Sequence, residues 1–416
     1  MGRSPAAPDS RLSPGEAGAL AGQSRTRRWP RRWWLFHPLD LMVRRWPVRR
    51  RRRGVVVIRM DGIGDMVLFQ GAFRHYPAAL GVARSEITVL GGHSWASLAE
   101  TVYQDCRFRA IDEHAYARRP IYRFTTSLWV RRQGFAVAVC DSYLRQPLVA
   151  DALVYASGAP LRVVAQPYTS PKTQAQFDWH LARVHRVIDT GSYPTHEVVR
   201  HFRFVSALAG QQFPAETPAL PWRRGRRGPR PLAERYAVLN LGSNEPGRRW
   251  PLAAFLEIAE HLARRGLSVV FAGGRVEAAL RGPVAEAARA SPWGGSFVDR
   301  IASTSLAELM DLQQHAELVI SSDTGPAHLA IGLGAPTIVI VGGGHFTSFV
   351  PYPAALTPPQ VRFVWRELPC YHCFWTCTQP HEAGASYPCL EAVSVARVRD
   401  AAEELLNLRL SASGSA

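Results

Sequence analysis

One short segment constrains the fold of this chain more than any other. Residues 55–58 are an uninterrupted run of β-branched side chains, and a glycine-containing turn follows them directly. Such a run is typical of a parallel strand buried on both faces, because a strand with one exposed face alternates apolar and polar residues. Residues 66–76 then show helical spacing that stops before Pro77. A strand, a tight turn and a helix in this order predict a doubly wound α/β fold.

The same unit recurs in two separate series. In the first, further strands are predicted at residues 87–90, 108–111 and 136–140. In the second, strands are predicted at 236–241, 267–272, 318–321 and 337–341, and helices at 252–265, 305–315 and 324–333. Two similar halves predict two Rossmann-like lobes with an interdomain cleft, which is where ligands of such folds bind.

Composition divides the 416 residues into four parts. We expect a basic Arg/Trp-rich leader at 1–53, an N-terminal lobe at 54–213, a Pro- and Arg-rich linker at 214–231 and a C-terminal lobe at 232–416. The C-terminal lobe includes a Cys-rich segment at 370–389. A chain of this length with 47% hydrophobic residues is large enough for two hydrophobic cores.

The leader carries most of the positive charge. Residues 1–53 hold 14 arginines and three acidic residues, which is +11 of the formal net charge of +17. Arginine interleaved with tryptophan and leucine is typical of a membrane interface, where indole rings lie at headgroup depth and arginine meets anionic lipid. An unstructured leader and a nucleic-acid-binding segment are the alternatives. We expect a disordered or membrane-surface segment and no nucleic-acid partner.

The remaining composition favours the cytoplasm. No run of 18 or more apolar residues occurs, so no membrane-spanning helix is predicted. Arginine and proline interrupt every apolar stretch of the leader, whereas a secretory signal has an uninterrupted apolar region. Six cysteines in so long a chain do not form a disulfide scaffold. We predict a cytoplasmic protein that is either free or peripheral on the inner face of the cytoplasmic membrane.

The first motif with catalytic potential follows the first strand. Gly62 and Gly64 allow a sharp turn and a close approach of a ligand to the backbone, and Asp65 lies at the carboxyl edge of the predicted sheet. There its carboxylate can act as a general base on an acceptor hydroxyl. Alternatively, Asp65 caps the helix that follows.

A second motif follows the strand at 236–241. Ser243 can donate a hydrogen bond to a ligand, and Arg248 and Arg249 offer planar cations that suit a diphosphate. A cation here would neutralise a diphosphate leaving group without a metal ion. The alternative is a solvated basic turn.

A third motif follows the strand at 318–321. Asp323 or Thr324 can cap the next helix, Pro326 suits its first turn, and Gly325 removes side-chain bulk beside the exposed N–H groups. These N–H groups and the helix dipole form a site for phosphate. His328 lies one turn further in, either as a catalytic group or as a packed, hydrogen-bonded residue.

A late group of cysteines is a predicted metal site. Four thiols lie within twenty residues, at Cys370, Cys373, Cys377 and Cys389. Four thiolates can hold structural zinc or iron in tetrahedral geometry, with His372 and His381 as substitute ligands. The alternative is a set of reduced cysteines in a C-terminal subdomain.

Taken together, the three motifs resemble those of a known family. The segments 59–65, 246–251 and 322–330 read RMDGIGD, PGRRWP and SDTGPAHLA. In order and spacing they are similar to the signatures of glycosyltransferase family 9, the ADP-heptose:lipopolysaccharide heptosyltransferases. The late cysteines resemble a Cys-rich tail seen in many members. The resemblance covers about residues 55–405.

The resemblance implies a GT-B fold with an acceptor-binding N-terminal lobe and a donor-binding C-terminal lobe. It also implies inversion at the anomeric carbon with no cofactor required for catalysis. By position, Asp65 is the catalytic base, and Arg248 stands where the family usually has a phosphate-binding lysine. The motifs and the resemblance together give a donor-binding set of Ser243, Arg248, Glu277, Asp323, Thr324, Gly325, Pro326 and His328, with Glu277 expected at the ribose.

One loop departs from the family pattern. After the strand at 337–341 the family often has F-G-x-T-x-P, whereas this chain has Gly342, Gly343, Gly344 and His345. Because this loop borders the expected donor pocket, the donor is ADP-heptose or another nucleotide sugar. The implied acceptor is a lipopolysaccharide core or a related anionic glycolipid at the inner-membrane surface. Two alternatives stay open: a GT-B epimerase of nucleotide sugars, and a non-catalytic module that only binds nucleotide sugar.

Overall fold

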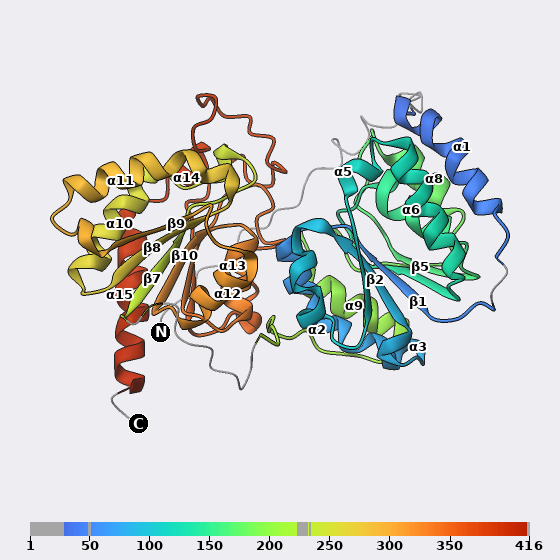
Figure 1. Ribbon diagram of the computed structural model, residues 1–416, viewed down its shortest axis with the longest axis horizontal. Helices are drawn as coiled ribbons and strands as arrows, with labels where there is room; N and C mark the ends of the chain where they lie inside the picture. The colour runs from blue at the N-terminus through green and yellow to red at the C-terminus, as the bar shows by residue number, and fades with distance from the viewer. Residues whose placement is uncertain (1–28, 49–50, 223–231, 233, 414–416) are drawn as a thin grey trace, which may run out of the picture.

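The computed structural model describes residues 29–48, 51–222, 232 and 234–413. Two α/β lobes lie side by side, the N-terminal one blue to green and the C-terminal one yellow to red (Figure 1). The first part of the expected leader, residues 1–28, and residues 223–231 of the expected linker lie outside the described residues. The predicted fold of two Rossmann-like lobes is confirmed.

Each lobe is built on a parallel sheet of six strands. The N-terminal strands are β1 (Val55–Arg59), β2 (Ile87–Gly92), β3 (Arg107–Ile111), β4 (Val137–Cys140), β5 (Leu161–Ala165) and β6 (Arg186–Ile188). The C-terminal strands are β7 (Tyr236–Asn240), β8 (Ser268–Gly273), β9 (Phe297–Ile301), β10 (Leu318–Ser322), β11 (Thr337–Ile340) and β12 (Val361–Val364). The orders β3-β2-β1-β4-β5-β6 and β12-β11-β10-β7-β8-β9 are the same Rossmann order. Each sheet therefore has one switch point, between β1 and β4 and between β7 and β10.

Helices cover both faces of the sheets. The N-terminal helices are α1 (Arg31–Arg45), α2 (Ile63–Phe73), α3 (Tyr76–Leu80), α4 (Ala99–Val102), α5 (Glu113–Tyr116), α6 (Pro120–Gln133), α7 (Ala152–Ser157), α8 (Gln174–Leu181) and α9 (Glu197–Ala209). The C-terminal helices are α10 (Leu252–Arg264), α11 (Arg281–Ala290), α12 (Leu306–His315), α13 (Gly325–Gly332), α14 (Pro388–Glu391) and α15 (Val395–Ser413). Every strand and helix predicted above is present, with ends shifted by a few residues.

The helix predicted at 66–76 is the main local difference. It begins earlier, with Gly62 as N-cap, and ends at Phe73. Pro77 does not terminate it but lies in the first turn of the separate helix α3. Proline suits a first turn because its missing N–H would have no partner there.

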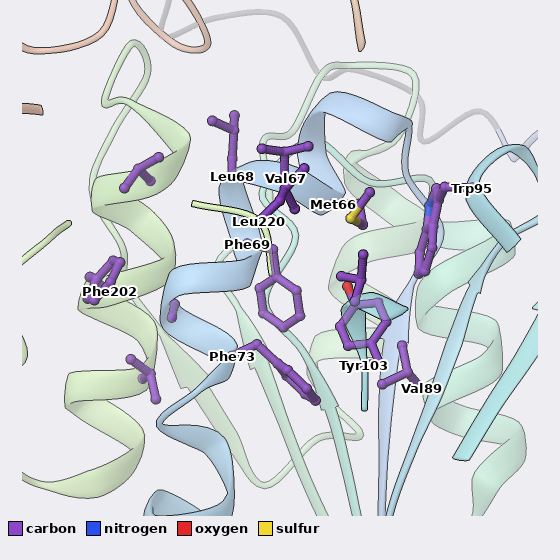
Figure 2. Close-up of a cluster of buried hydrophobic side chains, with 14 of the residues drawn as sticks. Met66, Val67, Leu68, Phe69, Phe73, Val89, Trp95, Tyr103, Phe202 and Leu220 are labelled. Carbon is purple, nitrogen blue, oxygen red and sulfur yellow. The ribbon is translucent and has the colours of Figure 1, made fainter. Parts of the chain in front are cut away.

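Strand β1 and helix α2 explain how the opening segment organises the N-terminal lobe. Val55 and Val57 belong to one buried cluster, and Val56 and Ile58 belong to another, so β1 is buried on both faces as predicted. Helix α2 is apolar on nearly all sides and lies inside the first cluster. Figure 2 shows side chains of α2 between Trp95 and Tyr103 on one side and Phe202 of α9 on the other. A helix enclosed in this way holds the turn before it in a fixed position.

The described part of the leader includes a helix, whereas a disordered or membrane-surface segment was expected at 1–53. Helix α1 packs on α6 and α7 along the outer edge of the N-terminal lobe, away from the C-terminal lobe (Figure 1). Phe36 is fully buried, and Asp40 forms a buried ion pair with Arg123 at 2.5 Å. The boundary expected at residue 54 is therefore too late, because α1 is part of the lobe. Among the described helices, none is both long and apolar enough to cross a membrane.

The described part of the expected linker is packed rather than free. Leu220 and Trp222 are buried, and Nε1 of Trp222 donates to Asp311 of α12 over 3.0 Å. The N–H of Leu220 donates to the carbonyl of Gly332 at the end of α13 over 2.8 Å. Residues 214–222 are rich in proline, which indicated a linker, but two large apolar side chains attach them to the C-terminal lobe.

Candidate active site

The carboxyl edges of the two sheets meet at one cavity. Its volume is about 630 Å³, and residues of both lobes line it. The lining loops follow β1 and β4 in the N-terminal lobe and β7 and β10 in the C-terminal lobe, so both switch points open into the cavity. Ligands of doubly wound folds bind at such points.

The cavity brings together most of the residues singled out in the sequence. Its lining includes Gly62, Gly64, Asp65, Ser243, Arg248, Glu277, Asp323, Thr324, Gly325, Pro326, His328 and His345. Gly342, Gly343 and the late cysteines are not part of this lining.

The two lobes touch through the first turns of α2 and α13. A Cβ at Gly64 would lie 2.7 Å from Cδ2 of His328, and a Cβ at Gly325 would lie 2.8 Å from Cβ of Ile63. Both distances are shorter than a carbon–carbon contact of about 3.5–4.0 Å. These glycines therefore permit the close approach of two helix N-termini, a role beyond the expected freedom to meet a ligand.

Asp65 lies in the first turn of α2 and faces the cavity. Its Oδ2 accepts a hydrogen bond from the N–H of Gly62 over 3.1 Å, so the side chain also caps the helix. Burial raises the pKa of Asp65 against the opposing effect of Arg59, and the carboxylate of Asp323 raises it further. A raised pKa makes this carboxylate a stronger base than an ordinary aspartate.

A buried charged network lies beneath Asp65. Arg59 pairs with Asp141 at 2.5 Å and with Asp61 at 2.7 Å. Asp141 also contacts Nδ1 of His201 at 2.9 Å, and Arg59 and His201 hold the pKa of Asp141 below its usual range in spite of burial. Because Nη2 of Arg59 also donates to the backbone oxygen of Asp65 over 3.5 Å, the network supports the turn before α2.

The N-terminus of α13 forms the facing wall. Thr324 is the N-cap and Pro326 lies in the first turn, as predicted. Thr324 occupies the N-cap position, but its hydroxyl donates to the carbonyl of Ser322 over 3.2 Å and accepts no hydrogen bond from the first turn of the helix. The helix dipole and the first-turn N–H groups thus make this end of the cavity suitable for an anion.

Asp323 and His328 are both buried beside this N-terminus. Burial raises the pKa of Asp323 to about 6, and Arg248 opposes the shift. Burial lowers the pKa of His328 to about 3, so its ring is neutral. Its Nδ1 lies 2.8 Å from the hydroxyl of Tyr352, and the ring stacks on that of Tyr352. His328 is thus a packed, hydrogen-bonded residue that also lines the cavity.

Arg248 is held in place by a ring and a carbonyl. It ends the 3₁₀ turn Pro246–Arg248, and its guanidinium carbon lies 4.2 Å from the centre of the Trp375 ring. Its Nη2 donates to the backbone oxygen of Asp323 over 3.3 Å. Its Nε is buried without a hydrogen-bond partner among the described residues. An oriented guanidinium with an unused N–H is suited to bind an anion.

Glu277 connects two loops of the C-terminal lobe. Its Oε1 accepts from Nη2 of Arg249 over 2.6 Å and from the N–H of Ser243 over 3.4 Å, and its Oε2 accepts from the N–H of Gly274 over 2.8 Å. Nη2 of Arg249 is therefore engaged by Glu277, and Arg249 is not part of the cavity lining. The ribose contact expected of Glu277 stays a prediction. By contrast, Ser243 lines the cavity, and its buried Oγ has no partner among the described residues.

The glycines at 342–344 serve a packing role. Trp375 lies against Gly342 and Gly344, and Tyr371 lies against Gly343, so closely that a Cβ at any of the three would clash with a ring. His345 is the residue of this loop that reaches the cavity. Burial lowers the pKa of His345 to about 4, and nearby Arg248 lowers it further, so the ring is neutral.

The late cysteines lie within electrostatic range of one another at Cys373 and Cys389. All four thiols are free, and Cys389 is buried in the core of the C-terminal lobe while Cys370, Cys373 and Cys377 are half-buried in the preceding loop. Across the described part of the chain, no three His, Cys, Asp or Glu side chains are placed to hold a metal ion. The zinc or iron site stays a prediction, because Cys373 and Cys389 still interact electrostatically with the other late thiols.

Aromatic rings of the Cys-rich segment contact the N-terminal lobe. The ring of Phe374 stacks on Tyr168 and Tyr193 of the N-terminal lobe at 4.9 and 4.7 Å, and the hydroxyl of Tyr193 lies 3.1 Å from Nδ1 of His372. His372, Phe374 and Trp375 have φ angles of 69°, 53° and 60°. Such backbone costs about 1–3 kcal/mol per residue and persists where surrounding contacts enforce it. These contacts place Trp375 at the cavity.

Two residues of the site were missed from the sequence. Trp375 lies in the Cys-rich segment, where only the cysteines and histidines were considered as functional residues from the sequence. Its position over Arg248 depends on the aromatic contacts between this segment and the N-terminal lobe. Asp61 follows Arg59 by two residues, and burial raises its pKa to about 6. Its Oδ2 accepts from Ser142 over 2.9 Å, whereas its Oδ1 has no partner among the described residues. The short spacing from Arg59 was the available signal for Asp61.

Two facing Rossmann-like lobes, with an anion site and a carboxylate across a shared cavity, define a glycosyltransferase of the GT-B class. The particular family follows from its sequence model, described as glycosyltransferase family 9 (heptosyltransferase), which matches residues 164–381. The chain belongs to glycosyltransferase family 9. No curated protein sequence matches the chain.

Solved structures share this fold at low sequence identity. The family 9 glycosyltransferase from Veillonella parvula has a TM-score of 0.65 at 16% identity, over 86% of this chain and 99% of that chain. The ADP-heptose LPS heptosyltransferase II from E. coli has a TM-score of 0.61 at 17% identity, over 86% and 99%. The E. coli heptosyltransferase WaaC with ADP-2-deoxy-2-fluoro heptose has a TM-score of 0.60 at 15% identity, over 84% and 99%.

Proposed function

We propose that this enzyme is an inverting transferase that moves a heptose or a related sugar from a nucleoside diphosphate to a hydroxyl of an anionic glycolipid. One observation carries the proposal: Asp65 lies on one wall of the cavity and the N-terminus of α13 lies on the facing wall. One wall offers a proton acceptor and the other an anion site. A single-displacement sugar transfer needs these two functions.

In this mechanism Asp65 takes the proton from the acceptor hydroxyl. The hydroxyl oxygen forms a bond to the anomeric carbon while the bond from that carbon to the diphosphate breaks on the opposite face. The electron pair leaves with the diphosphate, so the configuration at the anomeric carbon is inverted. The raised pKa of Asp65 suits this role, because it increases the basicity of the carboxylate.

The leaving diphosphate is stabilised by the C-terminal lobe. Arg248, Ser243 and the first turn of α13 all line the cavity, and Nε of Arg248 and the hydroxyl of Ser243 have no hydrogen-bond partner among the described residues. Fixed donors of this kind stabilise the charge that develops on a leaving group. We propose that they do so without a divalent cation, since the guanidinium supplies the positive charge.

The donor and acceptor classes rest on the family and on charge. The WaaC structure holds an ADP-heptose analogue, which supports a nucleoside-diphosphate heptose or a close relative as the donor. The cavity of about 630 Å³ is large enough for such a ligand. The formal net charge of +17 favours an anionic acceptor, such as a phosphorylated lipopolysaccharide core at the inner-membrane surface.

A transfer assay tests the proposal. The enzyme is incubated with an extracted lipopolysaccharide core and with ADP-, GDP- and UDP-sugars in turn, with and without EDTA. We expect the acceptor to gain the mass of one sugar, with an inverted linkage by NMR and an unchanged rate in EDTA. An isomerised donor sugar without a change in acceptor mass, or donor binding without turnover, would refute the proposal.

A further inference from the structure

The solvent-facing side of α1 has an unusual composition. On a helical projection, one face points away from the lobe and carries Arg31, Trp34, Leu35, Pro38, Met42 and Arg45. We call this face the α1 stripe. Trp34, Leu35 and Met42 are 65%, 55% and 46% exposed. A helix on a protein surface normally directs polar residues outward, so α1 presents apolar side chains where water would be expected.

The charge on this face has one sign. Arg31 and Arg45 lie at the two ends of the α1 stripe. The acidic residue of the helix, Asp40, points the other way and is buried against Arg123. Helix α1 therefore adds apolar and positively charged groups to the surface, but no negative charge.

A cluster of four arginines lies at the C-terminal end of the same helix. A Cβ at Gly158 would meet Nη1 of Arg131 and Nη1 of Arg44, so these two guanidinium groups converge there. The charges of Arg44 and Arg52 reach both Arg131 and Arg162. We call Arg44, Arg52, Arg131 and Arg162 the arginine cluster.

Backbone carbonyls, rather than carboxylates, hold this cluster together. Arg131 donates to the carbonyl of Trp46 over 2.9 Å, and Arg162 donates to the carbonyl of Arg183 over 2.9 Å. Burial, together with Arg44 and Arg52, lowers the pKa of Arg131 to about 10. Within the residues that the structure describes, no carboxylate forms an ion pair with any of the four. Burial and the mutual repulsion of these guanidinium groups are unfavourable, and an anionic ligand would offset the repulsion.

We propose that the α1 stripe and the arginine cluster dock the N-terminal lobe on the surface of an anionic lipid bilayer. The helix of 15 residues is about 22 Å long, which allows it to lie in the plane of the headgroups. Trp34, Leu35 and Met42 enter the boundary between headgroups and acyl chains. The half-buried Arg44, Arg52 and Arg162 bind lipid phosphates, as basic groups next to a membrane do, while the buried Arg131 adds its positive charge from beneath them.

The same observations disfavour other occupants of this face. In a two-fold contact between two copies of α1, each face meets its own equivalent, so antiparallel helices would bring Arg31 of one copy against Arg45 of the other. Such like-charge contacts are unfavourable. A nucleic acid would use the arginines but would leave the apolar residues of the α1 stripe exposed.

Vesicle co-sedimentation of the full chain tests the proposal. The vesicles contain either phosphatidylcholine alone or phosphatidylcholine with about one third phosphatidylglycerol. We expect binding to the anionic vesicles, and a decrease as salt increases. Trp34→Ser should weaken binding about tenfold, by loss of the inserted indole. Arg44→Gln with Arg52→Gln should weaken it about 25-fold, at roughly fivefold per arginine.

Matched controls come from the C-terminal lobe. Trp293 is 40% exposed, and Arg289 and Arg300 are exposed. Trp293→Ser and the double change Arg289→Gln with Arg300→Gln should leave vesicle binding unchanged. The thermal stability of each variant is measured alongside, and the salt dependence of the unaltered chain gives a readout that needs no substitution.

Three outcomes would overturn the proposal. The first is equal binding to neutral and anionic vesicles, or none to either. The second is a wild-type oligomer that Trp34→Ser dissociates, without vesicle binding, because the α1 stripe would then bind a second copy. The third is binding to RNA that needs the arginine cluster but not Trp34. All readouts are binding measurements, so they are independent of sugar transfer and of its proposed substrates.

Discussion

The contact between Gly64 and His328 allows a worked prediction for Gly64→Ala. The new Cβ would lie 2.7 Å from Cδ2 of His328, whereas carbon atoms in contact lie about 3.5–4.0 Å apart, so helix and ring must separate by about 1 Å. The ring cannot turn aside freely, because it is buried and bonded to Tyr352 at 2.8 Å. A displacement of about 1 Å between reacting groups costs about 10²-fold in rate. We expect kcat/KM to fall by about that factor.

The assay is steady-state sugar transfer, with Gly282→Ala as the control. Gly64 and Gly282 are each the second residue of a helix, but a Cβ at Gly282 has no neighbour within 4 Å. Alanine stabilises a helix by about 1 kcal/mol relative to glycine, so the control should be fully active and slightly more stable. Wild-type transfer by Gly64→Ala would refute the claim that the first turns of α2 and α13 set the geometry of the site.

Trp375, Asp65 and Asp40 each make an interaction that can be tested separately. Trp375→Leu removes the ring whose centre lies 4.2 Å from the guanidinium carbon of Arg248. A cation–π contact is worth about 0.5–2 kcal/mol, so the variant should bind ADP about 2- to 30-fold more weakly, as measured by calorimetry. Because the pKa of Asp65 is raised, its carboxylate is protonated at a higher pH than that of an ordinary aspartate. As the pH decreases, kcat/KM should therefore begin to fall above pH 3.8, the ordinary pKa of aspartate. A kcat/KM that stays constant down to pH 3.8 would contradict the role of Asp65 as the base. Asp40→Ala leaves Arg123 buried without its partner, which should cost about 3–5 kcal/mol in thermal or denaturant unfolding, and an unchanged stability would show that α1 does not hold to the lobe through this pair.

Local patterns predicted the elements that bear the site. The β-branched run at 55–58 and the glycine turns after β1, β7 and β10 each report a strand that ends at the carboxyl edge of a parallel sheet. Parallel sheets are buried on both faces, so this signal is strong in the sequence. This signal was sufficient to predict that Asp65, Arg248 and Thr324 lie at one cavity.

Features that depend on long-range packing were not accessible in this way. Helix α1 is apolar on two faces, and its ordered state depends on the pairing of Asp40 with Arg123, which lies 83 residues away. The placement of Trp375 over Arg248 depends on rings from the other lobe. The position of Cys389 in the hydrophobic core also depends on long-range packing. No local period in the sequence encodes such contacts.

The most direct test of the proposed mechanism is single-turnover transfer by Asp65→Asn, measured together with ADP affinity. Asp112→Asn is the matched control, because Asp112, like Asp65, accepts a hydrogen bond from a backbone N–H at the N-terminus of a helix but does not line the cavity. We expect a loss of about 10²–10⁴-fold in transfer for Asp65→Asn at unchanged ADP affinity, and no loss for the control. Transfer by Asp65→Asn at the wild-type rate would show that the carboxylate facing α13 is not the base.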